Sequence, residues 1–335
     1  MNEQLRTRVA WLYYMENMTQ AEIAARLRLT RARVNRTLGE CRESGLVRIT
    51  LNSRFESCVV LEDKLRQRGL LRDAVIIPTP EDPDQLFGLL GRAAGDYLSR
   101  FIAINRLSNI GIGWGTTLRE TIRHLQPVGD PDLCVTSMMG GLSQGLELNT
   151  FEIAGELAKR LQAHCRYLAA PIYAASPRSR DTILAQEVFQ EVLKRWSTIE
   201  LALLSIGDMT PRSLLIRNGL PRDVSVDDLK AKGAVGDVLG QFLDARGRPI
   251  GHSINRRAIA LPLDRLAKVK TVALIAGGAN KTQIVAAALR GGVGHVLISD
   301  EKTVSAALSL IDHDNSASDV SGRQSYAATS RSQSS

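Results

Sequence analysis

The chain has 335 residues, of which 44% are hydrophobic, so it is long and apolar enough for two or three domains with sizeable cores. Its formal net charge of +8 makes binding to a polyanion plausible. Four scattered cysteines without a C-x-x-C pair indicate a reducing compartment and argue against a zinc site. Because no apolar run approaches the roughly 18 residues of a membrane span and the polar N-terminus lacks signal-peptide features, we expect a cytoplasmic protein without a membrane partner.

The N-terminal stretch predicts a helix-turn-helix followed by a wing. Apolar side chains recur at i, i+4 and i+7 over residues 5–12, which predicts a first helix. Thr19 and Glu22 form a T-x-x-E capping box at the start of a second helix, and Thr30 suits the N-cap of a third. Residues 46–51 then alternate like a short strand. Together these signals predict a winged helix-turn-helix.

The third helix is basic on the side away from its apolar stripe. A helix N-terminus ordinarily favours acids, yet the first turns of this helix are rich in arginine. The arrangement makes sense if this end meets phosphates and base edges in a major groove. A solvated basic helix is the alternative, but the capping box, the turn and the arginine cluster together favour DNA. The predicted DNA-binding residues are Thr19, Gln20, Thr30, Arg31, Arg33, Asn35 and Arg36.

The remainder of the chain has a different pattern of apolar and polar residues. Residues 53–71 suit a connecting helix whose apolar seam packs within the chain or against a second copy. Beyond it, strand and helix candidates alternate, which argues for an α/β domain with a mainly parallel sheet. Strands are expected at 74–77, 109–112, 133–139, 166–168, 201–206, 258–261, 271–275 and 295–298. Helices are expected at 85–101, 117–124, 153–163, 181–195, 263–266 and 281–289.

The stretch GIGWGTT, at residues 111–117, follows one strand candidate and opens a helix. Gly113 and Gly115 let backbone amides come close to an anion, the helix N-terminus offers free N–H groups, and two hydroxyls follow on Thr116 and Thr117. A phosphate or a sugar hydroxyl fits this loop. The G-x-G-x-G spacing is a poorer match to the dinucleotide fingerprint G-x-G-x-x-G. A plain tight turn between strand and helix is the alternative.

Three further segments could line the same crevice, because ligands of α/β proteins collect at the carboxyl ends of parallel strands. Gly141 follows the next strand candidate. Asp237 and Asp244 lie in GDVLGQFLDARGRPI, where they could hold polyol hydroxyls or could instead belong to a hairpin. Lys281 starts a helix after another glycine turn, where it could face a phosphate or lie on the surface.

An enzymatic function has little support in the sequence. The five histidines show no metal-ligand spacing, and the chain has neither a G-x-S-x-G elbow nor a Walker A loop. We therefore expect no catalytic residue, no metal and no cofactor. Two alternatives stay open: a sugar-phosphate isomerase-like enzyme fused to a DNA-binding module, with a pocket carboxylate as base, and a purely architectural DNA binder.

Four stretches resemble the SorC family of bacterial sugar-responsive transcription regulators: TQAEIAARLRLTRARVNRTL with GLVRITL, GIGWGTTLRETI, GDVLGQFLDARGRPI, and AGGANKTQIVAAALRGGVGHVLISDE. They follow the family's order across residues 5–310. The resemblance implies an effector domain similar to the phosphosugar isomerase and acetyl-CoA transferase-like fold, without the catalysis. It implies the effector-binding residues Gly113, Gly115, Thr116, Thr117, Gly141, Asp237, Asp244 and Lys281.

The resemblance also implies operator DNA and a sugar, polyol or sugar-phosphate effector as partners, with a homo-oligomer, either a dimer or the homotetramer usual in the family. The opening AWLYYMENMTQ resembles regulators of polyol operons, such as those for erythritol use. Two residues depart from the family pattern: Arg28, where the family often has glycine, and the bulky Trp114. We predict a repressor of a carbohydrate or polyol catabolic operon. The predicted domains are a winged helix-turn-helix at 1–52, a linker or oligomerisation helix at 53–72, a sugar-binding effector domain at 73–311 and a disordered tail at 312–335.

Overall fold

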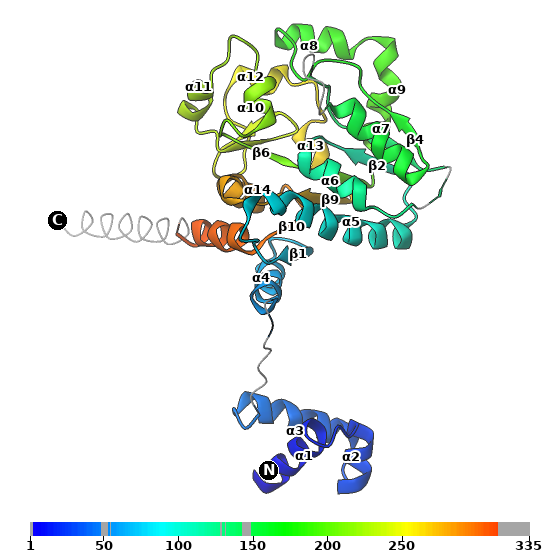
Figure 1. Cartoon of the computed structure of the whole chain (residues 1–335), viewed down its shortest axis with the longest axis vertical. Coiled ribbons are helices and arrows are strands. Elements are labelled where there is room, and N and C mark those ends of the chain that lie inside the picture. Colours follow the sequence, from blue (N-terminus) through cyan, green and yellow to red (C-terminus); the bar gives the residue numbers. More distant parts are fainter. Residues whose placement is uncertain are drawn as a thin grey trace, which may run out of the picture. The chain divides into compact units, whose positions relative to one another are not determined.

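The computed structural model describes residues 3–47, 53, 55–127, 129–130, 132–142 and 149–313, and the chain forms two compact units that divide between Glu56 and Ser57 (Figure 1). Each unit has a hydrophobic core of its own. Among the residues described, no helix is both long enough and apolar enough to cross a membrane. Most of the predicted wing and most of the predicted tail lie outside the described residues.

The first unit packs three helices around a small apolar core in which Ile23 and Val34 are fully buried. The predicted capping box is present. The Thr19 hydroxyl accepts from the Glu22 amide at 3.3 Å, and the Glu22 carboxylate accepts from the Thr19 amide at 2.7 Å. Thr30 caps the third helix by accepting from the Arg33 amide at 3.2 Å. The helices are α1 (Glu3–Tyr14), α2 (Gln20–Leu27) and α3 (Arg31–Glu43).

The turn between α2 and α3 holds one residue in a left-handed conformation. Arg28 has φ 54° and ψ 43° and follows the last residue of α2. The next amide, that of Leu29, donates to the Ala24 carbonyl at 2.8 Å. This is a Schellman-type ending, in which glycine is the usual residue because a Cβ is strained there. Arg28 therefore carries backbone strain where the family often has glycine.

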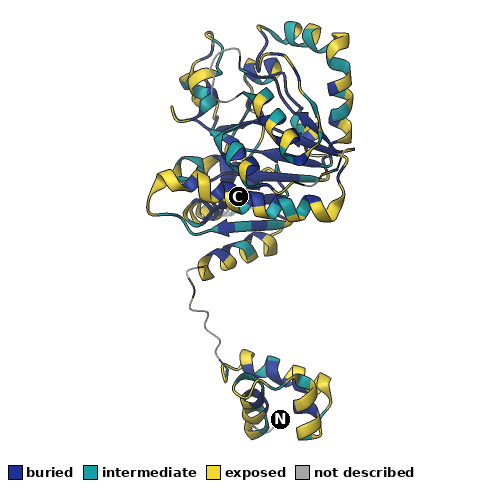
Figure 2. Cartoon of the chain, turned by 45° about the vertical axis from the view of Figure 1, so that its right-hand side comes forward, coloured by how far each residue is buried: buried dark blue, intermediate teal, exposed yellow. Residues whose placement is uncertain are grey.

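The second unit is built on a seven-stranded sheet in which every pairing is parallel, so the prediction of a mainly parallel α/β sheet is confirmed. Helices cover both faces of such a sheet, and its interior strands are drawn mainly in the dark blue of buried residues (Figure 2). All four residues of β5, for example, are buried. In spatial order the strands are β1 (Asp73–Ile77), β10 (Val296–Asp300), β9 (Thr271–Ile275), β5 (Leu201–Leu204), β2 (Asn109–Ile112), β3 (Cys134–Ser137) and β4 (His164–Arg166).

Each face of the large sheet has its own core. On one face, α5, α6 and α7 bury residues such as Leu98 and Leu118 against the strands. On the other face, α4, α14 and the helical residues 301–313 bury residues such as Leu65 and Val304. The helices of this unit are α4 (Glu56–Gln67), η1 (Pro83–Gln85), α5 (Leu86–Asn105), α6 (Thr116–His124), α7 (Thr150–Leu161), α8 (Pro177–Leu184), α9 (Glu187–Arg195), η2 (Trp196–Thr198), α10 (Leu214–Asn218), α11 (Val226–Ala231), α12 (Ser253–Arg257), α13 (Leu263–Leu266), η3 (Ala279–Lys281) and α14 (Thr282–Arg290).

A small antiparallel sheet interrupts one predicted strand. The expected strand at 201–206 ends at Leu204, because the chain leaves the large sheet at Ser205 and then pairs with a different partner. The small sheet contains β6 (Ile206–Asp208), β7 (Gly236–Val238) and β8 (Gln241–Leu243).

Other predicted elements are also wrong in type or bounds. Residues 258–261 form no sheet strand, because their backbone bonds go to loops, with the Ile259 amide donating to the Ile172 carbonyl at 2.8 Å. The single helix expected at 181–195 breaks where Gln186 is extended (ψ 137°). The strand expected at 166–168 lies two residues earlier, at β4. Residues 301–313 form a helix that the sequence analysis missed, and it includes the first two residues of the predicted tail.

Replacing Arg28 with glycine should stabilise the first unit. An L residue in the left-handed conformation costs about 1–2 kcal/mol, whereas glycine adopts it freely and loses somewhat more chain entropy on folding. We expect a net gain of about 1 kcal/mol, seen as slower hydrogen exchange of the buried Ile23 and Leu38 amides in the full chain. Ala25→Gly, within regular α2, is the matched control and should cost about 0.5–1 kcal/mol. Faster exchange in Arg28→Gly would show that this turn is not strained.

Candidate functional site

The exposed face of α3 presents the predicted DNA-binding side chains. Val34 and Leu38 are buried on its opposite face. With 3.6 residues per turn, Asn35 and Arg36 project from the middle of the exposed face and the other two arginines flank it. The predicted residues Arg31, Arg33, Asn35 and Arg36 are all exposed.

Two further features shape this face. The Gln20 side-chain amide donates to the Asn35 side-chain carbonyl at 3.4 Å, which ties the start of α2 to the middle of α3. The small residues Ala32 and Gly39 lie on the same side as Asn35, and a Cβ built on Gly39 would meet no atom within 4 Å. This side of the helix is therefore open to the close approach of a duplex.

The glycine loop lies at the carboxyl end of β2, as the sequence predicts. The Gly113 amide donates to the Leu203 carbonyl of β5 at 2.9 Å. Gly115 has φ 130° and is the N-cap of α6, without a side-chain cap. The first intrahelical bond here runs from the Arg119 amide to the Gly115 carbonyl, so the amides of the first turn, beginning with Thr116, are free of intrahelical acceptors. This is an anion-binding geometry.

The flanking side chains have different environments. Thr116 is partly exposed, whereas Thr117 is buried and its carbonyl accepts from the Thr121 hydroxyl at 2.8 Å. Thr117 can therefore reach a ligand through its backbone amide more readily than through its hydroxyl. Trp114 is buried in the core and does not obstruct the loop.

A buried ion pair lies next to this loop. The Lys281 ammonium is 2.8 Å from the Asp208 carboxylate and donates to the Ile206 carbonyl at 2.8 Å. Asp208 also accepts from the Asn280 side-chain amide at 2.7 Å and from the Thr210 amide at 2.8 Å. Burial alone would raise the pKa of Asp208. The charge and hydrogen bond of Lys281, together with the hydrogen bonds from Thr210, outweigh burial and lower this pKa below its ordinary value.

Asp237 belongs to the same cluster. One of its carboxylate oxygens accepts from the Gly240 amide at 3.0 Å. The other oxygen lies so close to Gly207 that a Cβ built on this glycine would be only 1.8 Å from it. Burial raises the pKa of Asp237 to about 6. The hydrogen bond from the Gly240 amide and the charge of Lys281 lower this pKa, whereas the negative charge of Asp208 raises it further. The cluster thus holds two carboxyl groups around one ammonium.

The glycine loop and the ion pair meet at the end of β5. A Cβ on Gly115 would lie 3.3 Å from the Ser205 side chain, and the next residue, Ile206, accepts from Lys281. A Cβ on Gly113 would lie 3.4 Å from Leu239, one residue before Gly240. We call this group the edge site, and it comprises Gly113, Gly115, Thr116, Thr117, Asp208, Asp237 and Lys281.

Two predicted effector residues are engaged elsewhere. The Gly141 amide donates to the Ala170 carbonyl at 2.8 Å, and a Cβ on Gly141 would lie 2.2 Å from the Asn149 side chain. Both oxygens of Asp244 accept hydrogen bonds from Arg248, one from its amide at 2.9 Å and the other from its guanidinium at 3.0 Å. The bonds of Asp244 fit the hairpin alternative, in which Gly247 (φ 76°) takes the turn position.

Asp208 and its partner Asn280 belong to the site although neither was predicted from the sequence. A usable signal existed for Asp208, because it is an acid that follows a long apolar strand, at the edge where ligands of parallel sheets collect. Asn280 precedes Lys281 in the predicted glycine turn, but only the fold shows that both side chains reach Asp208.

A helix-turn-helix with an exposed basic helix, followed by an α/β domain with charged and anion-binding groups at one sheet edge, defines the class of DNA-binding transcriptional regulators that carry a ligand-binding domain. Known proteins agree with this class. The chain matches the family model described as "Putative sugar-binding domain" over residues 53–309 and a MarR family model over residues 9–54.

Similar proteins cover nearly the whole chain. It is 31% identical over 314 residues to the transcriptional regulator LsrR of Klebsiella pneumoniae, covering 92% of this chain and 94% of LsrR. It is 28% identical over 305 residues to the erythritol catabolism regulatory protein EryD of Brucella abortus, covering 91% and 96%. The crystal structure of the full-length sorbitol operon regulator SorC from Klebsiella pneumoniae aligns with a TM-score of 0.68 and 25% identity over 90% of this chain and 97% of that chain. The chain belongs to the SorC family of sugar-binding transcriptional regulators.

Single alanine variants of α3 should separate base reading from phosphate contact. Arg36→Ala should cost about 1–3 kcal/mol of operator binding and relax specificity at one base pair, because it projects from the middle of the exposed face. Arg31→Ala, at the flank, should weaken binding to all sequences. It should also reduce the slope of the logarithm of the binding constant against the logarithm of salt concentration by about one, the value for one lost phosphate contact. The measurement is fluorescence anisotropy with an operator duplex that the wild-type protein selects from a random pool.

Arg42→Ala, in the last turn of α3, is the matched control and should bind as the wild type does. If the Arg31 and Arg36 variants also bind like the wild type, α3 is not the helix that contacts DNA.

Asp237→Asn should remove a pH dependence of stability between about pH 4 and 6. Because the pKa of Asp237 rises from 3.8 to about 6 on folding, the folded state holds this proton more tightly than the unfolded state does. Its contribution to stability is therefore largest below pH 3.8 and is lost as the pH rises through 6, a change of about 3 kcal/mol. Urea unfolding of both proteins across this range should show the wild type losing stability relative to the variant. Parallel curves would contradict the assignment.

Proposed function

We propose that the chain is a repressor of a carbohydrate or polyol catabolic operon, released from its operator when a sugar, polyol or sugar-phosphate effector binds at the edge site. The observation that carries this proposal is the edge site itself, where the free amides of α6 and the Lys281 ammonium lie around one strand end. Two similar proteins, EryD and SorC, are named for erythritol catabolism and the sorbitol operon, which supports a polyol or its phosphate as the effector.

The edge site offers hydrogen-bond donors for an anion. An ammonium has three N–H donors, and Lys281 uses two of them on Ile206 and Asp208. With 15% of its side chain exposed, Lys281 can direct the third toward a ligand oxygen. The first-turn amide of Thr116 adds a donor that the helix dipole strengthens.

Regulation follows from coupling the edge site to operator binding. A typical coupling free energy of about 1–3 kcal/mol corresponds to a change in operator affinity of roughly 5–150-fold. A two-fold assembly on a pseudo-palindromic operator roughly doubles the contacts of a single helix-turn-helix, so we propose a dimer or homotetramer as the working form. We propose that the protein works in the bacterial cytoplasm, because operator DNA lies there.

A sugar-phosphate isomerase activity is the second candidate, because a carboxyl group with a pKa near 6 is suited to act as a general base. We infer binding without turnover, because one Asp237 oxygen is held by the Gly240 amide and the other lies against Gly207. Incubating the wild-type protein with erythritol, sorbitol and their terminal phosphate monoesters, and assaying for isomerised products, decides between the two.

Gly115→Asp should leave operator binding intact and abolish the response to effector. The new carboxylate would occupy the anion position at the start of α6, and α3 lies in the other unit. Because the backbone of Gly115 (φ 130°) strains any side chain, Gly115→Ala is the matched control that has the strain without the charge. Thr116→Ala should weaken the response by about 1–3 kcal/mol if its hydroxyl donates to the ligand.

The measurement is operator binding by each variant across titrations of erythritol, sorbitol, their phosphate monoesters and inorganic phosphate. Circular dichroism confirms that each variant is folded. A folded Gly115→Asp protein that responds at the wild-type effector concentration would exclude the glycine loop from the site and leave Asp237 and Lys281 as its core.

A further inference from the structure

A third buried carboxylate, beside those of Asp208 and Asp237, lies at the same sheet edge and has no assigned role. Asp300 ends β10 with 1% of its surface exposed. One oxygen accepts from the Gly278 amide at 2.8 Å and from the Thr303 hydroxyl at 2.5 Å. The other accepts from the Thr79 hydroxyl at 2.7 Å and from the Thr303 amide at 3.2 Å. A buried carboxylate is tolerated only when it is satisfied in this way.

The Gly278 bond fixes the turn that delivers Lys281. Gly278 has φ 101°, and a Cβ on Gly277 would lie 2.5 Å from an Asp300 oxygen, so two glycines let the carboxylate reach this backbone. Three residues after Gly278, Lys281 enters the edge site and binds Asp208. The Gly278 amide also donates to the Thr303 hydroxyl at 2.8 Å, and this hydroxyl is itself bonded to Asp300, so the position of the lysine depends on Asp300 together with Thr303.

The Thr79 bond leads away from the edge site, toward β1 and α4. Thr79 lies two residues beyond β1, the outermost strand of the sheet. On the outer side of this strand the Ile76 amide donates to the Glu62 carboxylate of α4 at 2.8 Å. Burial raises the pKa of Glu62, although this amide bond opposes the shift. An edge-strand amide that would otherwise lie open is therefore paired with a helix side chain.

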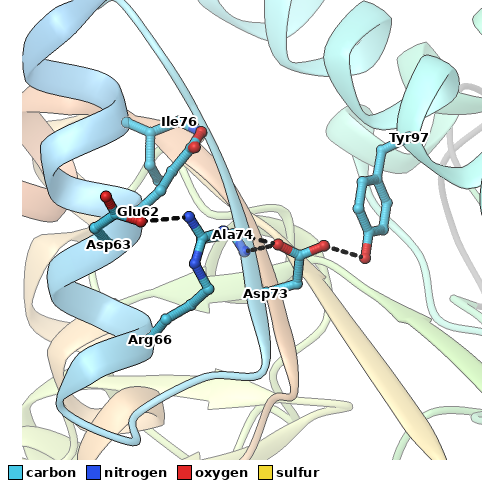
Figure 3. Close-up of polar contacts among 7 residues, drawn as sticks. All are labelled: Glu62, Asp63, Arg66, Asp73, Ala74, Ile76 and Tyr97. Atoms are coloured by element: carbon cyan, nitrogen blue, oxygen red, sulfur yellow. Dashed lines mark hydrogen bonds and ion pairs between the residues drawn. The ribbon is translucent and has the colours of Figure 1, made fainter. Parts of the chain in front are cut away.

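More side chains fix α4 to the same strand. The Arg66 guanidinium of α4 lies 2.7 Å from the Asp63 carboxylate of the same helix and 3.2 Å from the Asp73 carboxylate of β1. The Tyr97 hydroxyl of α5 donates to the Asp73 carboxylate at 2.9 Å (Figure 3). Helix α4 follows directly on the boundary of the first unit in the chain. Hydrogen bonds and short stretches of backbone therefore connect Lys281 to α4: the Gly278 turn bonds to Asp300, Asp300 to Thr79, and Thr79 continues through the backbone to Ile76, which bonds to Glu62 of α4.

We propose that Asp300 is a positioning residue of the edge site and that Thr79 is the contact through which a shift of the Gly278 turn reaches β1 and α4. The inference rests on the proposed function. An anionic effector that takes the third N–H of Lys281 gives the ammonium a second negative partner, which weakens the attraction of Asp208 and shifts the turn that carries the lysine. Because neither oxygen of Asp300 can be left unpaired without cost, the carboxylate and Thr79 move with the turn.

The test compares Thr79→Val, which removes the hydroxyl at equal size, with Thr79→Ser, which keeps it. Hydrogen exchange of the ligand-free full chain is measured at the Ile76 and Gly278 amides, with the Ile122 amide of α6 as internal reference. We expect Thr79→Val to speed exchange at Ile76 at least about tenfold over Thr79→Ser, with Ile122 unchanged. Equal rates at Ile76 in the two variants would overturn the proposal, whatever the effector is.

The second arm uses the phosphate monoester of erythritol or sorbitol that shifts the wild-type melting temperature more. Thr79→Val should bind this phosphate monoester with an affinity within about threefold of wild type. The change in operator affinity that the monoester causes should nevertheless be at least about fivefold smaller than in wild type. Thr79→Ser should restore the wild-type change in operator affinity. Asp300→Asn, checked for folding, should weaken binding of this probe at least about tenfold. Full coupling in Thr79→Val, or unweakened binding in Asp300→Asn, would overturn the proposal. A wild-type protein that binds neither monoester contradicts the proposed function instead, and the exchange experiment still decides this inference.

Discussion

Parallel pairing is the constraint on which the rest of the second unit depends. Because the seven strands all run in one direction, every strand ends at the same edge, and whatever follows a strand is brought there. The glycine loop after β2, Ser205 after β5, the Lys281 turn after β9 and Asp300 at the end of β10 are distant in sequence. They share an edge only because the sheet aligns them. An antiparallel sheet of the same strands would divide them between two edges.

Charge burial makes this edge suitable for a switch. Removing Lys281 and Asp208 from water is costly. The pair is tolerated because a carbonyl accepts from the ammonium, and amide and hydroxyl groups donate to the carboxylate, in addition to the ion pair. Asp237 adds a second carboxyl group whose ionisation is disfavoured by burial. An anionic ligand would supply Lys281 with a second negative partner and so change the balance of forces on its turn. Such a cluster responds to a ligand more readily than an apolar core of equal size.

Local signals in the sequence predicted local features well. The Thr19 capping box, the Thr30 cap and the glycine loop before α6 depend on residues a few positions apart, and the structure contains each of them. The parallel sheet followed from the alternation of strands and helices. The Asp300 bonds to Thr79 and Gly278 could not be foreseen, because they join segments that are far apart in the chain. For the same reason the apolar run at 258–261 resembled a sheet strand, although its hydrogen bonds go to loops.

Thermodynamic coupling between operator DNA and the effector is the central claim, and linkage makes it reciprocal. The most direct measurement is calorimetric titration of the active phosphate monoester into the wild-type protein, first free and then saturated with operator duplex. We expect operator DNA to weaken effector binding by the same factor, roughly 5–150-fold, by which the effector weakens operator binding. Equal effector affinity in the free and operator-bound protein would contradict it.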